Sequence, residues 1–214
     1  ALNGTVKDGS GGAVAAAARQ WRAEFLSAMG RHEEAIAEIK RAQQTGPFSL
    51  IVNTALAGAY YFARQDDRAI AECQRVIELD PNFGEIYSWL QRVYEHKGMP
   101  REALAAQQKL AELMGWETDY VEKVRRSESV KSMQAYWRKR LTLEMEAPPP
   151  FSFWVAECWA QLGAKDQAFF WLEKLSQERS YWAIYLNVVP TIDPLRSDPR
   201  FRALLRRVGL PQAD

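Results

Sequence analysis

The side chains that most often carry catalysis are sparse in this sequence. The two histidines, His32 and His96, stand at an expected helix start and near an expected helix end, and neither has an evident partner. The chain contains none of the spaced motifs that bind a dinucleotide, cradle a nucleoside phosphate, ligate zinc in a protease or present a serine nucleophile. We therefore predict that this chain is not an enzyme.

Metal and redox chemistry have equally little support in the sequence. Cys73 and Cys158 lie far apart in helical patterns, form no CxxC motif and have too few histidines around them for a zinc set. They are interpreted as two buried free thiols. Glu33 and Glu34 fall on the first turn of an expected helix, where negative charge favours the helix dipole. No metal and no cofactor are predicted.

One stretch, residues 123 to 140, combines basic and aromatic residues, a combination that can contact phosphates and bases. Its members are Lys123, Arg125, Arg126, Lys131, Tyr136, Trp137, Arg138, Lys139 and Arg140. Interspersed glutamates dilute its charge, so the favoured interpretation is a solvated amphipathic helix with Met133, Trp137 and Leu141 on its buried side. A nucleic-acid contact through this stretch is kept as an alternative.

The bulk composition is that of a globular protein. The chain has 214 residues, of which 47% are hydrophobic and 26% charged, and 28 basic residues nearly cancel 27 acidic ones. No strong overall field would attract nucleic acid or an anionic membrane. No apolar run approaches the roughly 20 residues that a bilayer span needs. We therefore expect a cytoplasmic location and no membrane contact, and the composition does not favour a nucleic-acid partner.

A repeat is the clearest feature of the chain. Three alanines, Ala35, Ala69 and Ala103, recur every 34 residues, and Pro47 and Pro81 have the same spacing. The positions expected to end the preceding helices follow the same period, as Gly30, Arg64 and Gly98. A constant period of this length indicates stacked units of supersecondary structure, in which small residues allow two helices to approach closely.

This period, with an alanine followed by a large residue four positions later and then a proline, resembles the tetratricopeptide repeat family. The resemblance implies an all-α fold, a right-handed α-solenoid of helix-turn-helix units. We expect a disordered segment over 1–12 and one solenoid over 13–214. The units fall at about 16–49, 50–83, 84–116, 117–148 (degenerate) and 149–180, with a capping helix within 181–210.

The first helices of such units line a concave groove. Successive residues of a helix are turned by 100°, so the positions of each first helix that do not pack within its own unit can be identified, and their side chains are expected to face the groove. The candidates are Gln20, Trp21, Glu24, Thr54, Tyr61, Phe62, Ser88, Trp89, Arg92, His96 and Trp154. Trp21, Trp89 and Trp154 share one position of the repeat, which fits either packing between units or contact with a partner.

We expect a non-enzymatic module that binds a protein or peptide, with no small-molecule substrate. The repeats followed by DPLRSDPRF resemble the C-terminal repeat regions of large bacterial regulators, which implies a scaffold or sensory part in signalling. The lysine and asparagine clamp that similar domains use for a C-terminal carboxylate is absent here. The alternative is the non-catalytic repeat region of an enzyme that resembles Ser/Thr O-glycosyltransferases.

Overall fold

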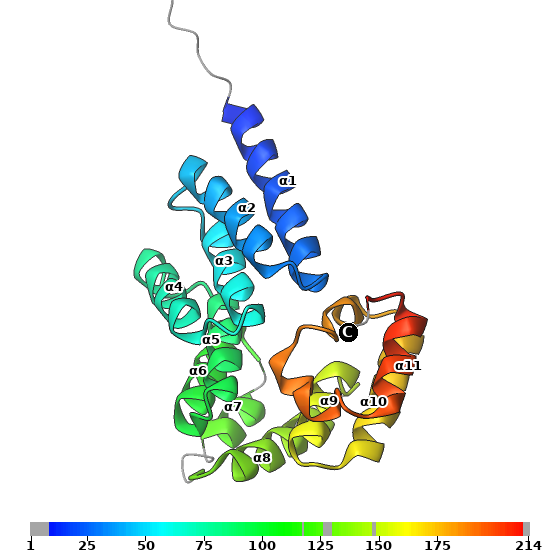
Figure 1. Cartoon of the computed structure of the whole chain (residues 1–214). Coiled ribbons are helices and arrows are strands. Elements are labelled where there is room, and N and C mark those ends of the chain that lie inside the picture. The colour runs from blue at the N-terminus through cyan, green and yellow to red at the C-terminus, as the bar shows by residue number, and fades with distance from the viewer. Residues whose placement is uncertain (1–8, 117, 126–129, 147–148, 212–214) are drawn as a thin grey trace, which may run out of the picture.

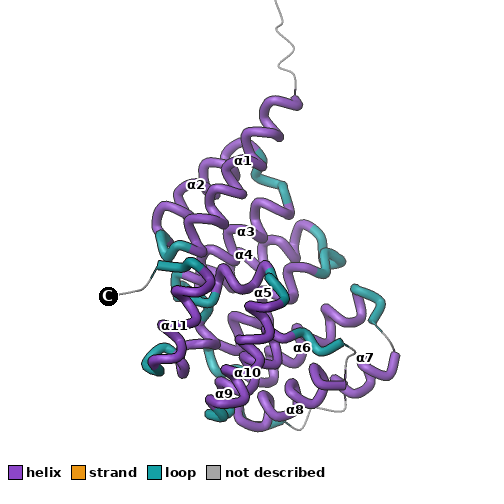
Figure 2. Tube along the Cα trace, turned by 90° about the vertical axis from the view of Figure 1, so that its right-hand side faces the viewer, coloured by secondary structure: helices purple, strands orange, loops and turns teal. Residues whose placement is uncertain are grey.

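The computed structural model describes residues 9–116, 118–125, 130–146 and 149–211, and all its regular elements are helices (Figures 1 and 2). The expected all-α class is confirmed. The α-helices are α1 Gly9–Ala28, α2 His32–Thr45, α3 Leu50–Phe62, α4 Asp66–Leu79, α5 Glu85–His96, α6 Pro100–Leu113, α7 Thr118–Arg125, α8 Met133–Glu146, α9 Ser152–Gln161, α10 Lys165–Gln177 and α11 Pro199–Val208. Two 3₁₀ helices, η1 Tyr181–Tyr185 and η2 Pro190–Leu195, precede α11.

Four pairs of consecutive helices pack as hairpins: α1 with α2, α3 with α4, α5 with α6 and α9 with α10. In the first three pairs the repeated alanine is the fourth residue of the second helix, and the fourth pair has an alanine at the same position. These residues are Ala35, Ala69, Ala103 and Ala168, and all are fully buried. Only a methyl group fits where the two helices approach so closely, so this placement explains the period of the alanines.

The turn inside each hairpin adopts the same left-handed conformation. Gly98 has a φ of 70°, and Met99 N donates to Tyr94 O at 2.9 Å, as in a Schellman cap. Arg64 occupies the equivalent position with a φ of 60°, which costs a non-glycine residue about 1 kcal/mol. Its guanidinium lies 2.8 Å from Asp193, so this turn is tied to η2.

The expected degenerate unit over 117–148 contains α7 and α8, which share a buried cluster that includes Val124 and Trp137 and an ion pair between Lys123 and Glu146. Helix α7 packs on α6, whereas α8 packs mainly on α9. Trp137 is buried as predicted, with Met133 and Leu141 half-buried beside it. Arg140 and Tyr136, which were expected on the basic outer face, are instead buried, because α8 is covered on more than one side.

Helix α1 begins at Gly9, inside the segment expected to be disordered through residue 12. Residues 1–8 lie outside the described part of the chain. At the other end, α11 lies within the range 181–210 expected for the capping helix, and at its start Asp198 accepts a hydrogen bond from Arg200 N at 3.0 Å. Phe201 and Leu204 are buried, and α11 packs on α10.

The C-terminal segment returns to the first units of the array. Helices α1 to α8 follow one another in order, and α9 to α11 turn back so that the segment with η1 lies near the end of α1 (Figure 1). Phe62 of α3 and Tyr185 of η1 stack with ring centroids 4.9 Å apart and an interplanar angle of 5°. One buried cluster accordingly contains residues of α1 to α5 together with residues of α9, α10, η1, η2 and α11.

Among the described helices, none combines the length and the apolar character needed to span a membrane.

Candidate functional site

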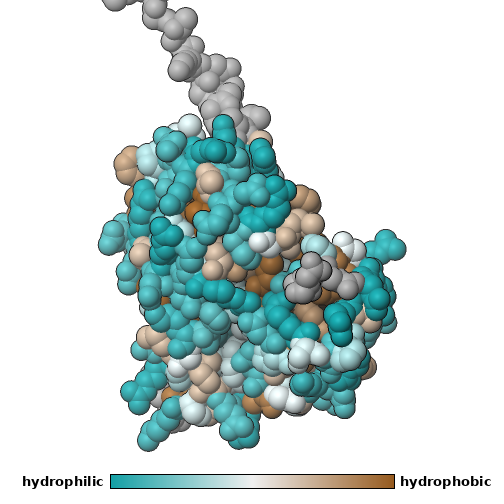
Figure 3. All heavy atoms as spheres, viewed as in Figure 1, coloured by the Kyte–Doolittle hydropathy of each residue, from teal (hydrophilic) through white to brown (hydrophobic). Residues whose placement is uncertain are grey.

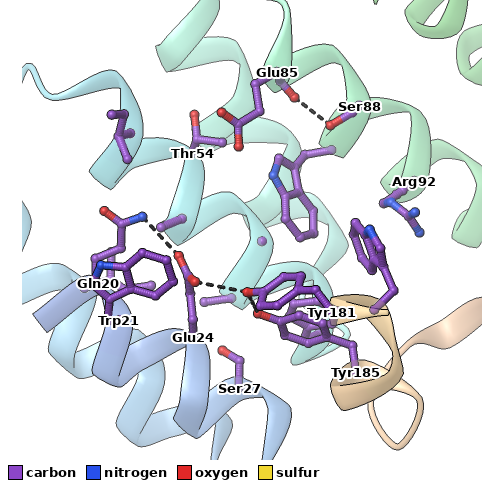
Figure 4. A pocket seen from close by; sticks show the side chains of 18 residues that line it. Gln20, Trp21, Glu24, Ser27, Thr54, Glu85, Ser88, Arg92, Tyr181 and Tyr185 are labelled. Carbon is purple, nitrogen blue, oxygen red and sulfur yellow. Dashed lines mark hydrogen bonds between the residues drawn. The ribbon is translucent and has the colours of Figure 1, made fainter. Parts of the chain in front are cut away.

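A cleft of about 570 Å³ opens between the first helices of the first three units and η1. In Figure 4, Gln20, Trp21, Glu24 and Ser27 come from α1, Thr54 from α3, Glu85, Ser88 and Arg92 from α5, and Tyr181 and Tyr185 from the C-terminal segment. On the face drawn in Figure 3, apolar residues gather between the first helices and the C-terminal part, and most of the residues around them are hydrophilic. We call this cleft the groove.

The structure brings eight of the eleven predicted side chains together around the groove. These are Gln20, Trp21, Glu24, Thr54, Phe62, Ser88, Trp89 and Arg92. They come from three helices that are spaced one repeat apart in the sequence. Helical periodicity and the 34-residue repeat together therefore predicted residues that lie on one surface.

Three predicted residues lie outside the lining of the groove. Tyr61 is fully buried beneath it, and burial raises the pKa of its hydroxyl above the usual range. His96 Nδ1 lies 2.8 Å from Asp66 Oδ2, so this histidine has a partner that the sequence did not reveal. Trp154 lines a separate hollow of about 40 Å³ and packs against Phe151 at 4.7 Å.

The three tryptophans of the shared repeat position therefore have different environments. Trp21 is 65% exposed at the edge of the groove. Trp89 is half-buried, and its ring meets Tyr61 at 5.9 Å and Phe62 at 5.6 Å, so it both packs between units and forms a wall of the groove.

Gly58 sets the position of the Trp89 ring. A Cβ atom at Gly58 would lie 2.9 Å from two ring carbons of Trp89, well inside van der Waals contact. We expect Gly58→Val to lower the free energy of unfolding by about 1–3 kcal/mol through overpacking. In a Trp89→Ala background the same change is expected to cost at least about 1 kcal/mol less, measured by urea denaturation. Equal costs in both backgrounds would contradict this contact.

The repeat period did not predict the wall that the C-terminal segment supplies. Tyr181, Trp182 and Tyr185 all line the groove, but they lie outside the 34-residue period on which the prediction depended. Their only signal in the sequence was the aromatic-rich run SYWAIYL. The Tyr181 hydroxyl donates to Glu24 Oε2 at 3.2 Å and lies 2.5 Å from the Tyr185 hydroxyl, so hydrogen bonds join this wall to α1.

The groove carries two carboxylates near its mouth. Glu24 Oε1 accepts a hydrogen bond from Gln20 at 3.0 Å, and Glu85 lies across the groove on α5 (Figure 4). Burial raises the pKa of Glu85, and the negative charge of Glu24 raises it further. This end of the groove is therefore acidic.

Arg92, which lines the groove, belongs to a buried ionic network. Arg92 lies 2.9 Å from Glu157, and Arg140 lies 2.7 Å from Glu95 and 3.5 Å from Glu157. Thr191 donates to Glu157 at 2.5 Å. The network joins α5, α8, α9 and η2, so it holds the C-terminal segment against the third unit.

The two cysteines match their predicted role. Both are buried free thiols, and burial raises the pKa of Cys73 to about 12 and that of Cys158 well above its usual range.

Burial and the nearby charge of Arg64 lower the pKa of His32. Within the described ranges, no group of three or more His, Cys, Asp or Glu residues is arranged to hold a metal ion.

The described residues of the stretch 123–140, which are 123–125 and 130–140, do not form a continuous basic surface. Arg140 belongs to the buried network, and Tyr136 and Trp137 are buried, so neither ring offers a face for stacking on a base. Lys123 lies 2.7 Å from Asp119 and 2.8 Å from Glu146. Arg126 lies outside the described residues.

A scan of the chain against protein-family models finds no match, and a search of the curated proteins finds no related sequence.

Proposed function

We propose that this chain is a right-handed solenoid of the tetratricopeptide type whose groove binds an extended segment of a partner protein without catalysing a reaction. The repeated alanine at the fourth position and the repeated left-handed turn support the family assignment. The DPLRSDPRF resemblance favours a place as the scaffold or sensory part of a larger cytoplasmic bacterial regulator.

One observation carries the binding function: a groove of about 570 Å³ with aromatic side chains on three sides. Large rings with an apolar body and a polar edge are typical anchors at binding sites. Here most of them are already held in place. Phe62 stacks on Tyr185, and Trp89 is packed against Phe62 and Gly58, so a ligand would order few further side chains.

The test uses peptides selected on the immobilised protein from a random phage-displayed library. Trp21→Ala is expected to weaken the selected peptides by at least about tenfold, because the indole is an exposed anchor. The free energy of unfolding should change by less than about 0.5 kcal/mol, since this side chain is 65% exposed. Titration calorimetry and urea denaturation measure the two effects.

Phe170→Ala is the matched control. Phe170 is also an exposed ring on a helix, 62% exposed on α10, but it does not line the groove. We expect it to leave peptide affinity unchanged. If no peptides are selected, or if both variants bind them as the parent does, the groove is not the binding site.

A further inference from the structure

The negative charges that line the groove are not neutralised by positive side chains in the part of the chain that the structure describes. Glu24, Glu85 and Arg92 are the charged residues of its lining. Arg92 is only 6% exposed and lies 2.9 Å from Glu157, so a buried carboxylate already offsets its charge. Among the described residues, no lysine or arginine forms an ion pair with Glu24 or Glu85. The mouth of the groove therefore presents negative charge without a counterion.

An unpartnered hydroxyl lies on α3, the helix between the two that carry these carboxylates. Thr54 is 2% exposed, and its Oγ1 has no hydrogen-bond partner within the described part of the chain. A buried hydroxyl that makes no hydrogen bond is costly and calls for an explanation. Thr54 lines the groove from α3, between α1 with Glu24 and α5 with Glu85 (Figure 4). A bound N–H donor would satisfy this oxygen.

The aromatic walls favour the same sign of charge. Trp21, Trp89 and Tyr181 line the groove together with the two carboxylates. The faces of such rings are negative and attract an ammonium or guanidinium group. Rings, carboxylates and an acceptor hydroxyl together form a site for a cation that is attached to an apolar stem.

We infer that the groove recognises a partner segment through a lysine or arginine side chain flanked by apolar residues, with the cation between Glu24, Glu85 and Thr54. This inference depends on the proposed function, since it names the partner chemistry of the same groove. Lysine and arginine suit this arrangement because their stems pack on the indoles while their donors reach the carboxylates.

The test compares three peptides of the form acetyl-Gly-Ser-Leu-Xaa-Leu-Ser-Gly-amide, in which Xaa is lysine, norleucine or glutamate. Binding is followed in the full chain by shifts of amide signals in heteronuclear NMR spectra, which also locate the site. The lysine peptide is expected to bind at the groove at least about tenfold more tightly than the norleucine peptide, with no binding of the glutamate peptide.

Variants of Glu24, Glu85 and Thr54 test whether these groups cause the preference for the lysine peptide over the norleucine peptide. The double variant Glu24→Gln with Glu85→Gln is expected to bind the lysine and norleucine peptides equally. The control double variant Glu78→Gln with Glu102→Gln removes the same charge from exposed positions on α4 and α6, outside the lining of the groove, and should keep the preference. Thr54→Val should weaken the lysine peptide without lowering the melting temperature, because it removes a buried hydroxyl that has no partner.

The outcomes separate the two proposals. Equal binding of the lysine and norleucine peptides at the groove would overturn the cation inference and leave the proposed binding function standing. Tighter binding of the glutamate peptide, or a lysine preference that survives in the Glu24→Gln, Glu85→Gln variant, would also overturn it. If none of the three peptides shifts groove signals while library-selected peptides do, the inferred chemistry is wrong. If the selected peptides also fail, the proposed function is wrong as well.

Discussion

Glu157→Ala is expected to destabilise the fold by about 3–5 kcal/mol. Glu157 is fully buried and contacts two cations, Arg92 at 2.9 Å and Arg140 at 3.5 Å. Its removal would leave both guanidinium groups in a region of low dielectric with one fewer counter-charge. It would also free the Thr191 hydroxyl that now donates to it. Urea denaturation of the variant and the parent measures the difference.

The control for this prediction is Glu173→Ala. Glu173 lies 2.5 Å from Arg207, but both side chains are about half exposed. Because water screens an exposed pair, its loss should cost no more than about 1 kcal/mol. A similar cost for the two variants would mean that the buried network contributes no more than a surface ion pair.

Ala69→Arg is expected to cost more than about 4 kcal/mol in the free energy of unfolding, and it should abolish a cooperative transition if the array cannot adjust. Ala69 is fully buried where α4 meets α3. An arginine there would force the two helices apart and bury a guanidinium with no partner. Circular dichroism during thermal unfolding measures the loss.

Ala71→Arg separates this effect from that of the substitution itself. Ala71 lies two residues further along the same helix and is exposed. Arginine is a good helix former, so we expect a change within about 0.5 kcal/mol. A parent-like melting temperature for Ala69→Arg would refute the placement of the repeated alanines at the helix contact.

The groove depends on contacts between distant parts of the chain. Tyr181 reaches Glu24 across 157 residues, and Arg64 reaches Asp193 across 129. These contacts and the buried network close one end of the groove with the C-terminal segment. For a ligand bound in the groove as proposed, binding and the stability of that segment would be coupled, because displacing η1 would remove one wall of the groove.

Local sequence determined the helices, their turns and the phase of the array. Ala35, Ala69 and Ala103 fixed the second helices, since a small side chain is required wherever two helices approach closely. Glycine at Gly30 and Gly98 fixed the turns, because it adopts a positive φ without strain. The period then brought eight of the eleven candidate side chains to one surface.

Only the tertiary structure decided which polar residues are buried and what closes the groove. Helical periodicity indicates which face of a helix a residue occupies, but not how many neighbours cover that helix. Arg140 therefore seemed exposed although it is buried against Glu95. Tyr181 and Tyr185 lie outside the repeat, and their place beside α1 and α3 follows from the return of the chain. Such long-range packing depends on the whole array and leaves no periodic signal in the sequence.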